Sequence, residues 1–298
     1  MRLPTVRQFR AFLHVAETGS VSIAAKSLGL TQPAVSQQLR ELERILSVRL
    51  FERANGRSIL TMAGQALVEP AQRAVAAAED AVAVTAESKH GETGQIRIGS
   101  GATGCIHLLP TVLAAVKQAM PRLTLKVTIG DTADLLPLVQ SGELDIGLMT
   151  LPVNRVAALS YQPLFSEPLM ALLPQSDGLF PKGITPQQLA QFPFIAYRAA
   201  GDTRTIADNW FDTGGGSPKP IMELGSFEAI KVLVGAGLGV AIVPKLALST
   251  PVSGTAICRL RPPLSRTVGY VVRGDKTLDR RLRLLIRHLE AFPAPWKS

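Results

Sequence analysis

Apolar residues recur every three or four positions near the start of the chain, a spacing typical of amphipathic helices. The apolar residues of the first predicted helix are Val6, Phe9, Leu13 and Ala16. Gly19 predicts the end of this helix, and Ser20 is placed to cap a second helix that carries "VSIAAKSLG". A third helix is predicted over "LTQPAVSQQLRELERIL", with Thr31 as its N-cap and Pro33 in the first turn, where proline is tolerated.

The second and third predicted helices have the spacing of a helix-turn-helix. Ala25 lies four residues before Gly29, and Val35 lies six residues after it. A small residue lets two helices cross closely, a glycine suits the tight turn between them, and an apolar residue anchors the second helix. Three leucines are expected to complete this core: Leu28, Leu30 and Leu39.

The third helix has one apolar face and one polar face. The apolar face carries Val35, Leu39, Leu42 and Leu46. The residues that could reach a DNA duplex are Thr31, Gln32, Pro33, Ser36, Gln37 and Arg40. Glutamine pairs with adenine edges, arginine with guanine edges or phosphate, and serine with either. A solvated outer face is the plain alternative, but the spacing of the helices favours DNA reading.

A β-hairpin is predicted directly after the third helix. Apolar residues flank Asn55-Gly56 in "VRLFERANGRSILT", and both central residues accept the positive φ of a two-residue turn. Arg53 and Arg57 bracket this turn, where a winged helix-turn-helix would bring them to phosphates or the minor groove. The alternative is a solvent-exposed hairpin without a ligand.

The whole chain has a net charge of +9, and its positive charge is concentrated at the two ends. Residues 1–60 hold nine Lys or Arg against four Asp or Glu, and residues 259–298 hold ten against three. A basic N-terminal module is typical of nucleic-acid binding, although a basic face can also serve solubility alone. The amphipathic pattern of "LDRRLRLLIRHLEAF" assigns the C-terminal charge to the outer face of a helix docked on the core.

The N-terminal residues resemble the DNA-binding domain of LysR-type transcriptional regulators. The resemblance is carried by "AAKSLGLTQPAVS", "LERIL", "LFER" and "LTMAG", and Ser47 departs from the glycine that the family usually has there. It implies that residues 1–60 form a winged helix-turn-helix that binds double-stranded DNA at an inverted repeat. RNA polymerase is a further candidate partner.

Residues 61–90 are rich in alanine and strongly helix-forming. A seam with spacings of three and four contains Val68, Ala71, Val75, Ala78 and Val82. Small residues in such a seam let two helices approach closely, and Pro70 is expected to kink or interrupt the helix. A helix packed on its own domain would show a similar pattern, whereas the resemblance implies that this linker helix pairs two subunits into a homodimer or homotetramer.

From Gln95 onward, strand-like and helix-like segments alternate, which predicts an α/β fold with mostly parallel sheets. Residues 152–167 and "RLRPPLSR" at 259–266 are candidate strands that cross between two lobes. The resemblance extends through "LVQSGELDIGLM" and "SFEAIKVLVGAGLGVAIVP". It implies a two-lobed effector domain over residues 91–298, similar to periplasmic binding proteins. Lobe I would hold about 91–162 and 267–298, and lobe II about 163–266.

The resemblance also implies a small-molecule effector between the two lobes. Along this cleft it puts Ser100, Thr103, Thr132, Thr150, Arg198, Thr203, Ser226 and Phe227. Hydroxyls and the N–H groups of helix N-termini suit an anion, so we hypothesise a carboxylate-bearing effector with Arg198 as its charge partner. Each hydroxyl could instead only cap a helix. Beyond the effector, neither a cofactor nor a metal is expected.

Two other classes of protein share some of these features. The loop "GSGATG" at 99–104 fits the G-x-G-x-x-G of dinucleotide-dependent enzymes, but Pro110 predicts a helix that starts near Leu109, offset from the glycines. Cys105 and His107 are two residues apart, a poor spacing for a reactive pair on a helix. A solute-binding protein would need an export signal, and none is recognisable at the N-terminus.

The cysteines and the hydropathy pattern bear on the compartment. Cys105 and Cys258 form no paired motif, which fits a reducing environment, and no apolar stretch has the length of a membrane span. We therefore expect a cytoplasmic, nucleoid-associated protein that does not bind membranes. Because the glycine loop and the Cys105–His107 spacing do not fit an active site, we also expect that the protein is not an enzyme.

Overall fold

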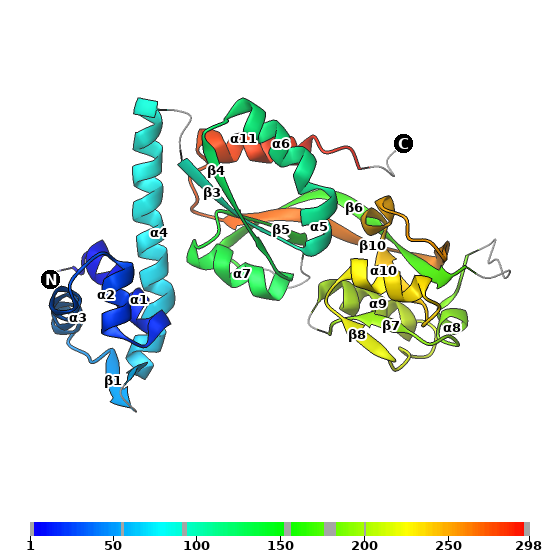
Figure 1. Cartoon of the computed structure of the whole chain (residues 1–298), viewed down its shortest axis with the longest axis horizontal. Coiled ribbons are helices and arrows are strands. Elements are labelled where there is room, and N and C mark those ends of the chain that lie inside the picture. The colour runs from blue at the N-terminus through cyan, green and yellow to red at the C-terminus, as the bar shows by residue number, and fades with distance from the viewer. Residues whose placement is uncertain are drawn as a thin grey trace. The chain divides into compact units, whose positions relative to one another are not determined.

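The computed structural model describes residues 3–54, 57–90, 94–151, 156–175, 183–199 and 201–294. The chain divides into two compact units, one formed by Met1–Gly91 with Gln140–Glu143 and the other by Glu92–Val139 with Leu144–Ser298. Figure 1 labels the elements of both units. The first unit contains α1 (Val6–Thr18), α2 (Val21–Ser27), α3 (Gln32–Leu46), β1 (Phe51–Ala54), β2 (Arg57–Leu60) and α4 (Met62–His90).

The first three helices begin and end at the residues that the sequence marks. The side chains of Ser20 and Thr31 cap α2 and α3 by accepting hydrogen bonds from backbone N–H groups of the first turn. Gly19 ends α1 in the left-handed conformation, with φ of 65°. Ser47 ends α3 in the same conformation, with φ of 55°, although its side chain disfavours that backbone.

A small hydrophobic core holds these helices together. Its buried residues include Phe12, Ala25, Val35 and Leu42, so the predicted small crossing residue and helix anchor are both confirmed. The prediction for Leu30 is wrong, because this side chain is 49% exposed beyond the turn. Gly64 packs where a Cβ atom would come within 2.3 Å of the Leu50 carbonyl oxygen, so only glycine fits there.

The hairpin that follows α3 is tied to the helices by backbone hydrogen bonds. Strands β1 and β2 pair antiparallel, and the Ser58 N–H donates to the Gly19 carbonyl at 2.9 Å. The Leu50 N–H donates to the Glu43 carboxylate at 2.8 Å. The predicted turn residues 55 and 56 lie outside the described residues.

Helix α4 continues through Pro70, so of the two predicted effects the interruption is wrong and the kink stays a prediction. Val68 and Ala71 of its seam pack against the core of the helix-turn-helix, which the alternative of a helix docked on its own domain had foreseen. Further along the helix Val82 is 67% exposed. The two parts of the seam therefore have different environments.

The second unit alternates helices and strands. Its elements are β3 (Gly94–Ser100), α5 (Ala102–His107), α6 (Leu109–Ala119), β4 (Leu123–Ile129), α7 (Thr132–Ser141), β5 (Ile146–Thr150), β6 (Leu159–Pro174), α8 (Pro186–Leu189), β7 (Ile195–Tyr197), α9 (Asp202–Asp212), β8 (Met222–Leu224), α10 (Phe227–Gly235), β9 (Ala241–Pro244), a 3₁₀ turn (Lys245–Ser249), β10 (Thr255–Arg273) and α11 (Arg280–Glu290).

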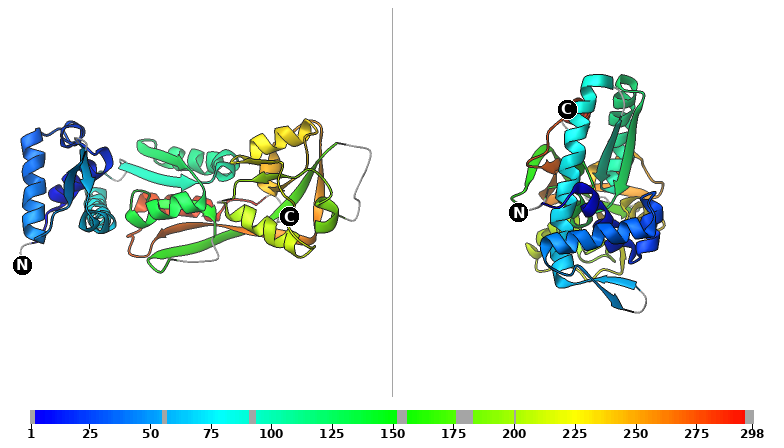
Figure 2. Two further views of the ribbon diagram at one scale, coloured as in Figure 1. Left: turned by 90° about the horizontal axis from the view of Figure 1, so that it is seen from below. Right: turned by 90° about the vertical axis from the view of Figure 1, so that its left-hand side faces the viewer.

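A six-stranded sheet in the order β4-β3-β5-β10-β6-β9 forms the frame of this unit. Strands β3, β4 and β5 are parallel, whereas β10 pairs antiparallel with both β5 and β6, and β9 pairs antiparallel with β6. A separate sheet pairs β7 with β8 in parallel, so the prediction of mostly parallel sheets holds for these strands and for β3–β5 but fails for the crossing strands. The reason is that β6 and β10 are long strands that carry the chain out and back, so they run in opposite directions beside each other (Figures 1 and 2).

Strands β6 and β10 connect two halves of the unit, as the sequence predicted for the crossing segments. Half A contains β3–β5 with α5–α7 and α11, and half B contains β7–β9 with α8–α10. In half A, α6 and α11 cover one face of the sheet, where Val112 and Leu285 are buried, and α7 covers the other face with Leu135. Helix α11 buries Leu282, Leu285 and Leu289, which confirms its predicted apolar face.

The longer helix after the glycine loop, α6, begins at Leu109, which confirms the start predicted from Pro110. A short helix that the sequence did not predict, α5, comes before it and starts directly at Ala102. At Gly104 a Cβ atom would lie only 2.8 Å from the Ser100 hydroxyl. The close packing of α5 on the end of β3 therefore accounts for this glycine without a nucleotide.

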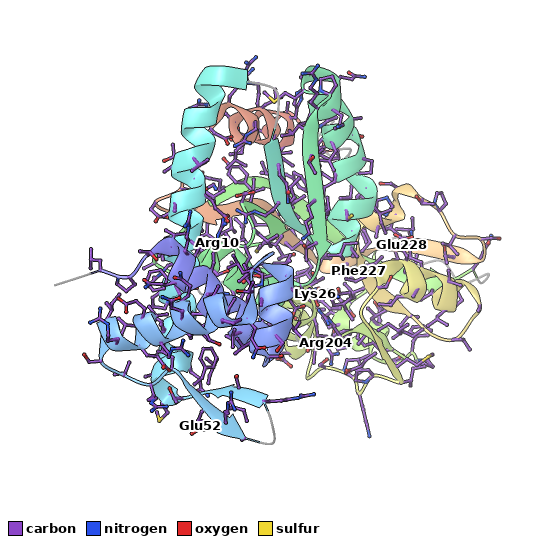
Figure 3. All side chains as sticks on the ribbon, turned by 60° about the vertical axis from the view of Figure 1, so that its left-hand side comes forward. Arg10, Lys26, Glu52, Arg204, Phe227 and Glu228 are labelled. Atoms are coloured by element: carbon purple, nitrogen blue, oxygen red, sulfur yellow. The ribbon has the colours of Figure 1, made fainter. Side chains whose placement is uncertain are left out.

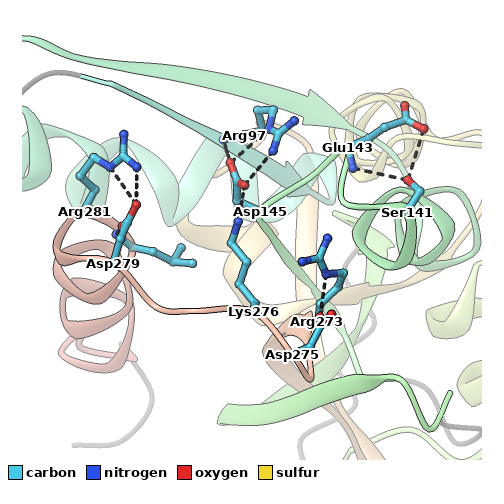
Figure 4. A network of polar contacts seen from close by, with 10 residues as sticks. Arg97, Ser141, Glu143, Asp145, Arg273, Asp275, Lys276, Asp279 and Arg281 are labelled. Atoms are coloured by element: carbon cyan, nitrogen blue, oxygen red, sulfur yellow. Dashed lines mark hydrogen bonds and ion pairs between the residues drawn. The ribbon is translucent and has the colours of Figure 1, made fainter. Parts of the chain in front are cut away.

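A network of charged side chains joins β3, the start of β5 and the segment after β10 (Figure 4). Asp145 accepts hydrogen bonds from the Arg97 N–H and guanidinium and from Lys276, at 2.8–3.2 Å. Burial alone would raise the pKa of Asp145, but the hydrogen bonds from Arg97 and the charges of Lys276 and Arg97 outweigh it. The pKa therefore lies below the ordinary value of an aspartate.

We expect Ser47→Gly to stabilise the first unit by about 0.5–1 kcal/mol, because glycine adopts the left-handed backbone without the steric cost of a Cβ atom. Hydrogen exchange of the α3 amides in the full chain measures this opening free energy. Gly29→Ser is the reciprocal control and should lower the opening free energy. Gly29 has φ of 65° and open space around it, so the substitution adds backbone strain without a clash. A lower opening free energy in Ser47→Gly would contradict the inference that Ser47 strains the backbone.

We expect Asp145→Asn to destabilise the second unit by about 3 kcal/mol at neutral pH, because Arg97 and Lys276 lose their shared anion. An unfolded aspartate has a pKa of about 3.9. Since the folded pKa is lower, the stabilisation is complete above the unfolded pKa and is lost as the pH falls through the folded pKa.

Urea midpoints measured across acid and neutral pH test this dependence. The variant should lack the acid-side loss that Asp145 contributes. Asp275→Asn is the matched control, because Asp275 pairs with Arg273 but is 73% exposed and its loss should cost less than about 1 kcal/mol. Equal effects of the two substitutions would show that burial of the network is unimportant.

Candidate DNA-binding surface and ligand cleft

The outer face of α3 is polar and open. Val35, Leu39 and Leu42 point into the core, and the opposite positions Gln32, Gln37 and Arg40 are exposed. Of the other predicted contact residues, Thr31 caps the helix, Pro33 is exposed in its first turn and Ser36 is half-buried. Their predicted contacts with DNA stay a prediction.

A shallow groove runs between this face and the start of α1. It is lined by Thr5, Val6, Arg7, Gln8, Gln37, Gln38, Arg40, Glu41 and Arg44. Arg7 is a basic residue that the sequence did not single out, because it lies a whole helix away from the recognisable motif. Arg44 donates to the Glu41 carboxylate at 2.7 and 2.9 Å, so its charge is partly matched within α3.

The hairpin presents its two arginines to solvent. Arg53 on β1 and Arg57 on β2 are both exposed, one on each side of the turn. Both guanidinium groups are therefore open to an anion such as a phosphate.

The second unit contains a cavity of about 60 Å³ between its two halves. Half A lines it with the loops after β3 and β4 and with the end of β5, and half B lines it with the loop after β7 and the start of α10. The polar groups come from Thr103, Asp131, Thr132, Thr150, Tyr197, Asp202, Thr203 and Arg266. Ends of parallel strands and starts of helices thus meet at one site, as is common for ligand sites in α/β folds.

Arg266 is the central cation of the cavity. It stands opposite Glu167 in the β10–β6 ladder and forms a buried ion pair with it at 2.7 Å. One of its amino groups also donates to the hydroxyls of Thr150 in half A and Thr203 in half B, at 3.3 and 3.0 Å. A single guanidinium therefore links both crossover strands and both halves.

Sequence reasoning missed Arg266 and Glu167 because the pairing of β6 with β10 joins residues that are far apart in the chain. The available signal was one charged residue at the end of each candidate crossing segment, Glu167 in the first and Arg266 in the second. Charged residues in strands that must pass through a core are expected to pair with each other.

A second set of contacts joins the halves at the rim. The Tyr197 hydroxyl and the Arg198 guanidinium, both in half B, donate to the Asp131 carboxylate of half A, and Arg198 also donates to Asp134 at 2.7 Å. Tyr197 stacks on Phe227 with ring centroids 4.4 Å apart. Burial and the hydrogen bond to Asp131 raise the pKa of Tyr197, so it remains a neutral donor.

A third contact between the halves joins α5 to α10. His107 and Glu228 lie 2.8 Å apart, and Lys231 pairs with Glu228 on the same helix (Figure 3 labels Phe227 and Glu228). Burial alone would raise the pKa of Glu228, but the hydrogen bonds from Lys231 and His107 outweigh it and keep the pKa below its ordinary value. Cys105, on the same short helix as His107, has a pKa raised by burial.

The cavity brings together five of the eight predicted effector residues: Thr103, Thr132, Thr150, Thr203 and Phe227. Ser100 is buried and donates to the Gly101 carbonyl, and Ser226 caps α10, so both side chains have structural partners. Arg198 is not among the lining residues and already pairs with two carboxylates. The structure thus gives Arg198 a different partner from the effector carboxylate that we hypothesised.

Metal clusters and membrane-spanning helices are two further features to consider in the part of the chain that the structure describes. Within it, no cluster of three or more His, Cys, Asp or Glu side chains is arranged to hold a metal ion. None of the helices among these residues combines the length and the apolar character needed to cross a membrane.

A helix-turn-helix with a basic wing, followed by an α/β unit with a cleft between two halves, defines a DNA-binding protein with a ligand-binding unit. Residues 6–65 match the family of bacterial regulatory helix-turn-helix proteins of the lysR type, and residues 89–293 match the LysR substrate binding domain. The chain belongs to the LysR family of bacterial transcriptional regulators. The predicted family and fold class are confirmed.

Individual relatives agree with this assignment. The HTH-type transcriptional regulator CfxR of Cupriavidus necator is 33% identical over 244 residues, which cover 82% of this chain and 76% of CfxR. The HTH-type transcriptional regulator IlvR of Caulobacter vibrioides is 32% identical over 294 residues, which cover 94% of this chain and 97% of IlvR.

Solved structures share the fold. A full-length OxyR variant from Pseudomonas aeruginosa has a TM-score of 0.80 at 23% identity and covers 98% of this chain and 96% of its own. Full-length CbnR in complex with its target DNA has a TM-score of 0.66 at 23% identity and covers 96% and 99%.

We expect Glu167→Gln to destabilise the second unit by about 3–5 kcal/mol, because the buried Arg266 guanidinium keeps its charge and loses its counter-ion. Urea unfolding followed by tryptophan fluorescence, to which the buried Trp210 contributes, measures the loss. Glu223→Gln, which removes a half-exposed partner of Arg204, should cost less than about 1 kcal/mol. Similar losses for both variants would contradict the central place of the Glu167–Arg266 pair.

Proposed function

We propose that the chain reads inverted-repeat DNA as a dimer through residues 32–40 of α3, with Arg53 and Arg57 on the flanking backbone. A small effector bound in the cavity between halves A and B regulates this binding. The observation that carries the proposal is the outer face of α3, which is exposed and polar on a helix whose opposite residues Val35, Leu39 and Leu42 are buried.

The chemistry of this face suits the major groove. Gln37 can donate and accept in one plane against adenine, and Arg40 can donate twice to guanine. Thr31 and the first N–H groups of α3 suit a phosphate, because the N-terminus of a helix favours an anion. Arg7 extends the same surface from α1 and is a further candidate for a phosphate contact.

A dimer follows from the symmetry of the proposed target. Two reading heads related by a two-fold axis fit two half-sites about 34–36 Å apart on one side of the duplex. Helix α4 is the element proposed to pair two copies, because its seam stays small and apolar beyond the core contacts of Val68 and Ala71, and Val82 there is exposed. RNA polymerase remains a proposed partner of the regulator on DNA.

The effector is proposed to act by changing the relation between halves A and B. The contacts of Arg266, Asp131 and His107 across the cleft depend on how the halves are arranged. A ligand that binds one arrangement more tightly shifts the population toward it. In a dimer, this shift can alter the pose of the two reading heads on DNA rather than their contacts with bases.

We expect Gln37→Ala and Arg40→Ala each to weaken binding to a specific promoter fragment by about 1–3 kcal/mol. Arg53→Ala and Arg57→Ala should instead weaken specific and random DNA alike and lower the salt slope of binding by about one. Fluorescence anisotropy of the full chain on both DNAs over a range of salt concentrations measures these effects.

Arg10→Ala is a matched control within the first unit, because the guanidinium is exposed but pairs with Glu79 on α4. It should bind DNA within about threefold of the unaltered chain. Unchanged affinity of both Gln37→Ala and Arg40→Ala would exclude α3 as the reading helix.

A further inference from the structure

The charges around the cavity are matched except at one carboxylate. Asp131 is neutralised by Arg198, and Arg266 is neutralised by Glu167. Asp202, at the start of α9, is the remaining charged lining residue. Among the described residues, its Oδ2 is the buried side-chain oxygen or nitrogen without a hydrogen-bond partner.

A carboxylate that lines a cavity without a matching cation favours a positively charged or neutral ligand beside it, because an isolated negative charge away from water is costly. An anionic ligand would instead meet this carboxylate with like charge, and neither Arg198 nor Arg266 is left unmatched to compensate. The N-terminus of α9 favours an anion, but Asp202 itself occupies the first turn and supplies that negative charge.

The other polar groups of the cavity are neutral hydroxyls. Thr150 and Thr203 accept hydrogen bonds from Arg266, so each hydroxyl hydrogen is left to donate to a ligand oxygen. The stacked rings of Tyr197 and Phe227 supply one apolar wall. With a volume of about 60 Å³, the cavity in this arrangement of the halves accommodates a molecule of only a few non-hydrogen atoms.

We propose that the cavity between halves A and B binds a small ligand without net negative charge, whose primary amine faces the Asp202 carboxylate and whose hydroxyl lies against Thr150 and Thr203. This inference rests on the proposed function of the cavity as the effector site. It replaces the carboxylate-bearing effector with an amine-bearing one, because the cations at the cavity are already paired.

Three probes of nearly equal size test the sign of the charge. Ethanolamine is a cation, ethylene glycol is neutral and glycolate is an anion, and each carries the same hydroxyl. Isothermal titration calorimetry uses the full chain in a buffer free of Tris and glycerol, since both share the chemistry of the proposed ligand. We expect ethanolamine to bind at least about tenfold more tightly than glycolate, with ethylene glycol between them.

The Asp202→Asn variant tests the residue. It should bind ethanolamine at least about tenfold more weakly than the unaltered chain and reduce the preference over glycolate. Asp212→Asn, an exposed aspartate at the other end of α9, is the matched control and should keep the preference. The comparison of the three probes on the unaltered chain decides the proposal even if Asp202→Asn fails to fold.

Three results would overturn the inference: glycolate binding as tightly as ethanolamine, no detectable binding of ethanolamine, or an unchanged preference in folded Asp202→Asn. A footprint on promoter DNA with the same preparation separates this outcome from the proposed function. A chain that protects DNA but prefers glycolate refutes only the amine. A chain that prefers ethanolamine but protects no DNA refutes only the regulator.

Discussion

The buried pair between Glu167 and Arg266 is the interaction on which the α/β unit depends. Each residue sits on one of the two strands that cross between the halves, and the two stand directly opposite in the ladder. Glu167 is 0% exposed and also accepts the Leu246 N–H at 2.7 Å. Because removing either ion from such a pair leaves a buried charge, the pair constrains where the strands can cross and which side chains can face the cavity.

This constraint gives the cavity its chemistry. Arg266 forms an ion pair with Glu167 and donates hydrogen bonds to Thr150 and Thr203. The cavity therefore offers hydroxyl groups to a ligand rather than an unpaired cation. Arg198, which is the more conspicuous arginine in sequence, is engaged at the rim by Asp131 and Asp134. The same contacts that satisfy these charges also tie half A to half B, so ligand binding and the arrangement of the halves share the same groups.

Local features of the fold could be predicted from the sequence, and nonlocal ones could not. Caps at Ser20 and Thr31 and the stop at Gly19 depend on neighbouring residues only, so the helices of the first unit follow from spacing. The antiparallel course of β6 and β10 depends on pairing between distant segments. The threonines of the cavity were predicted from the family resemblance. The roles of Arg266 and Asp202 could not be predicted, because they depend on which charged groups are paired in the folded chain.

The link that Arg266 makes between the halves can be measured most directly by spin-label distances in the full chain. Labels at Ile129→Cys in half A and Val232→Cys in half B report their separation, after Cys105 and Cys258 are replaced by serine; both labelled positions are exposed. Thr203→Val removes the bond from Arg266 to half B and leaves the ion pair with Glu167 intact. We expect a broader and longer distance distribution in that variant. An unchanged distribution would contradict the role of Arg266 as one of the links between the halves.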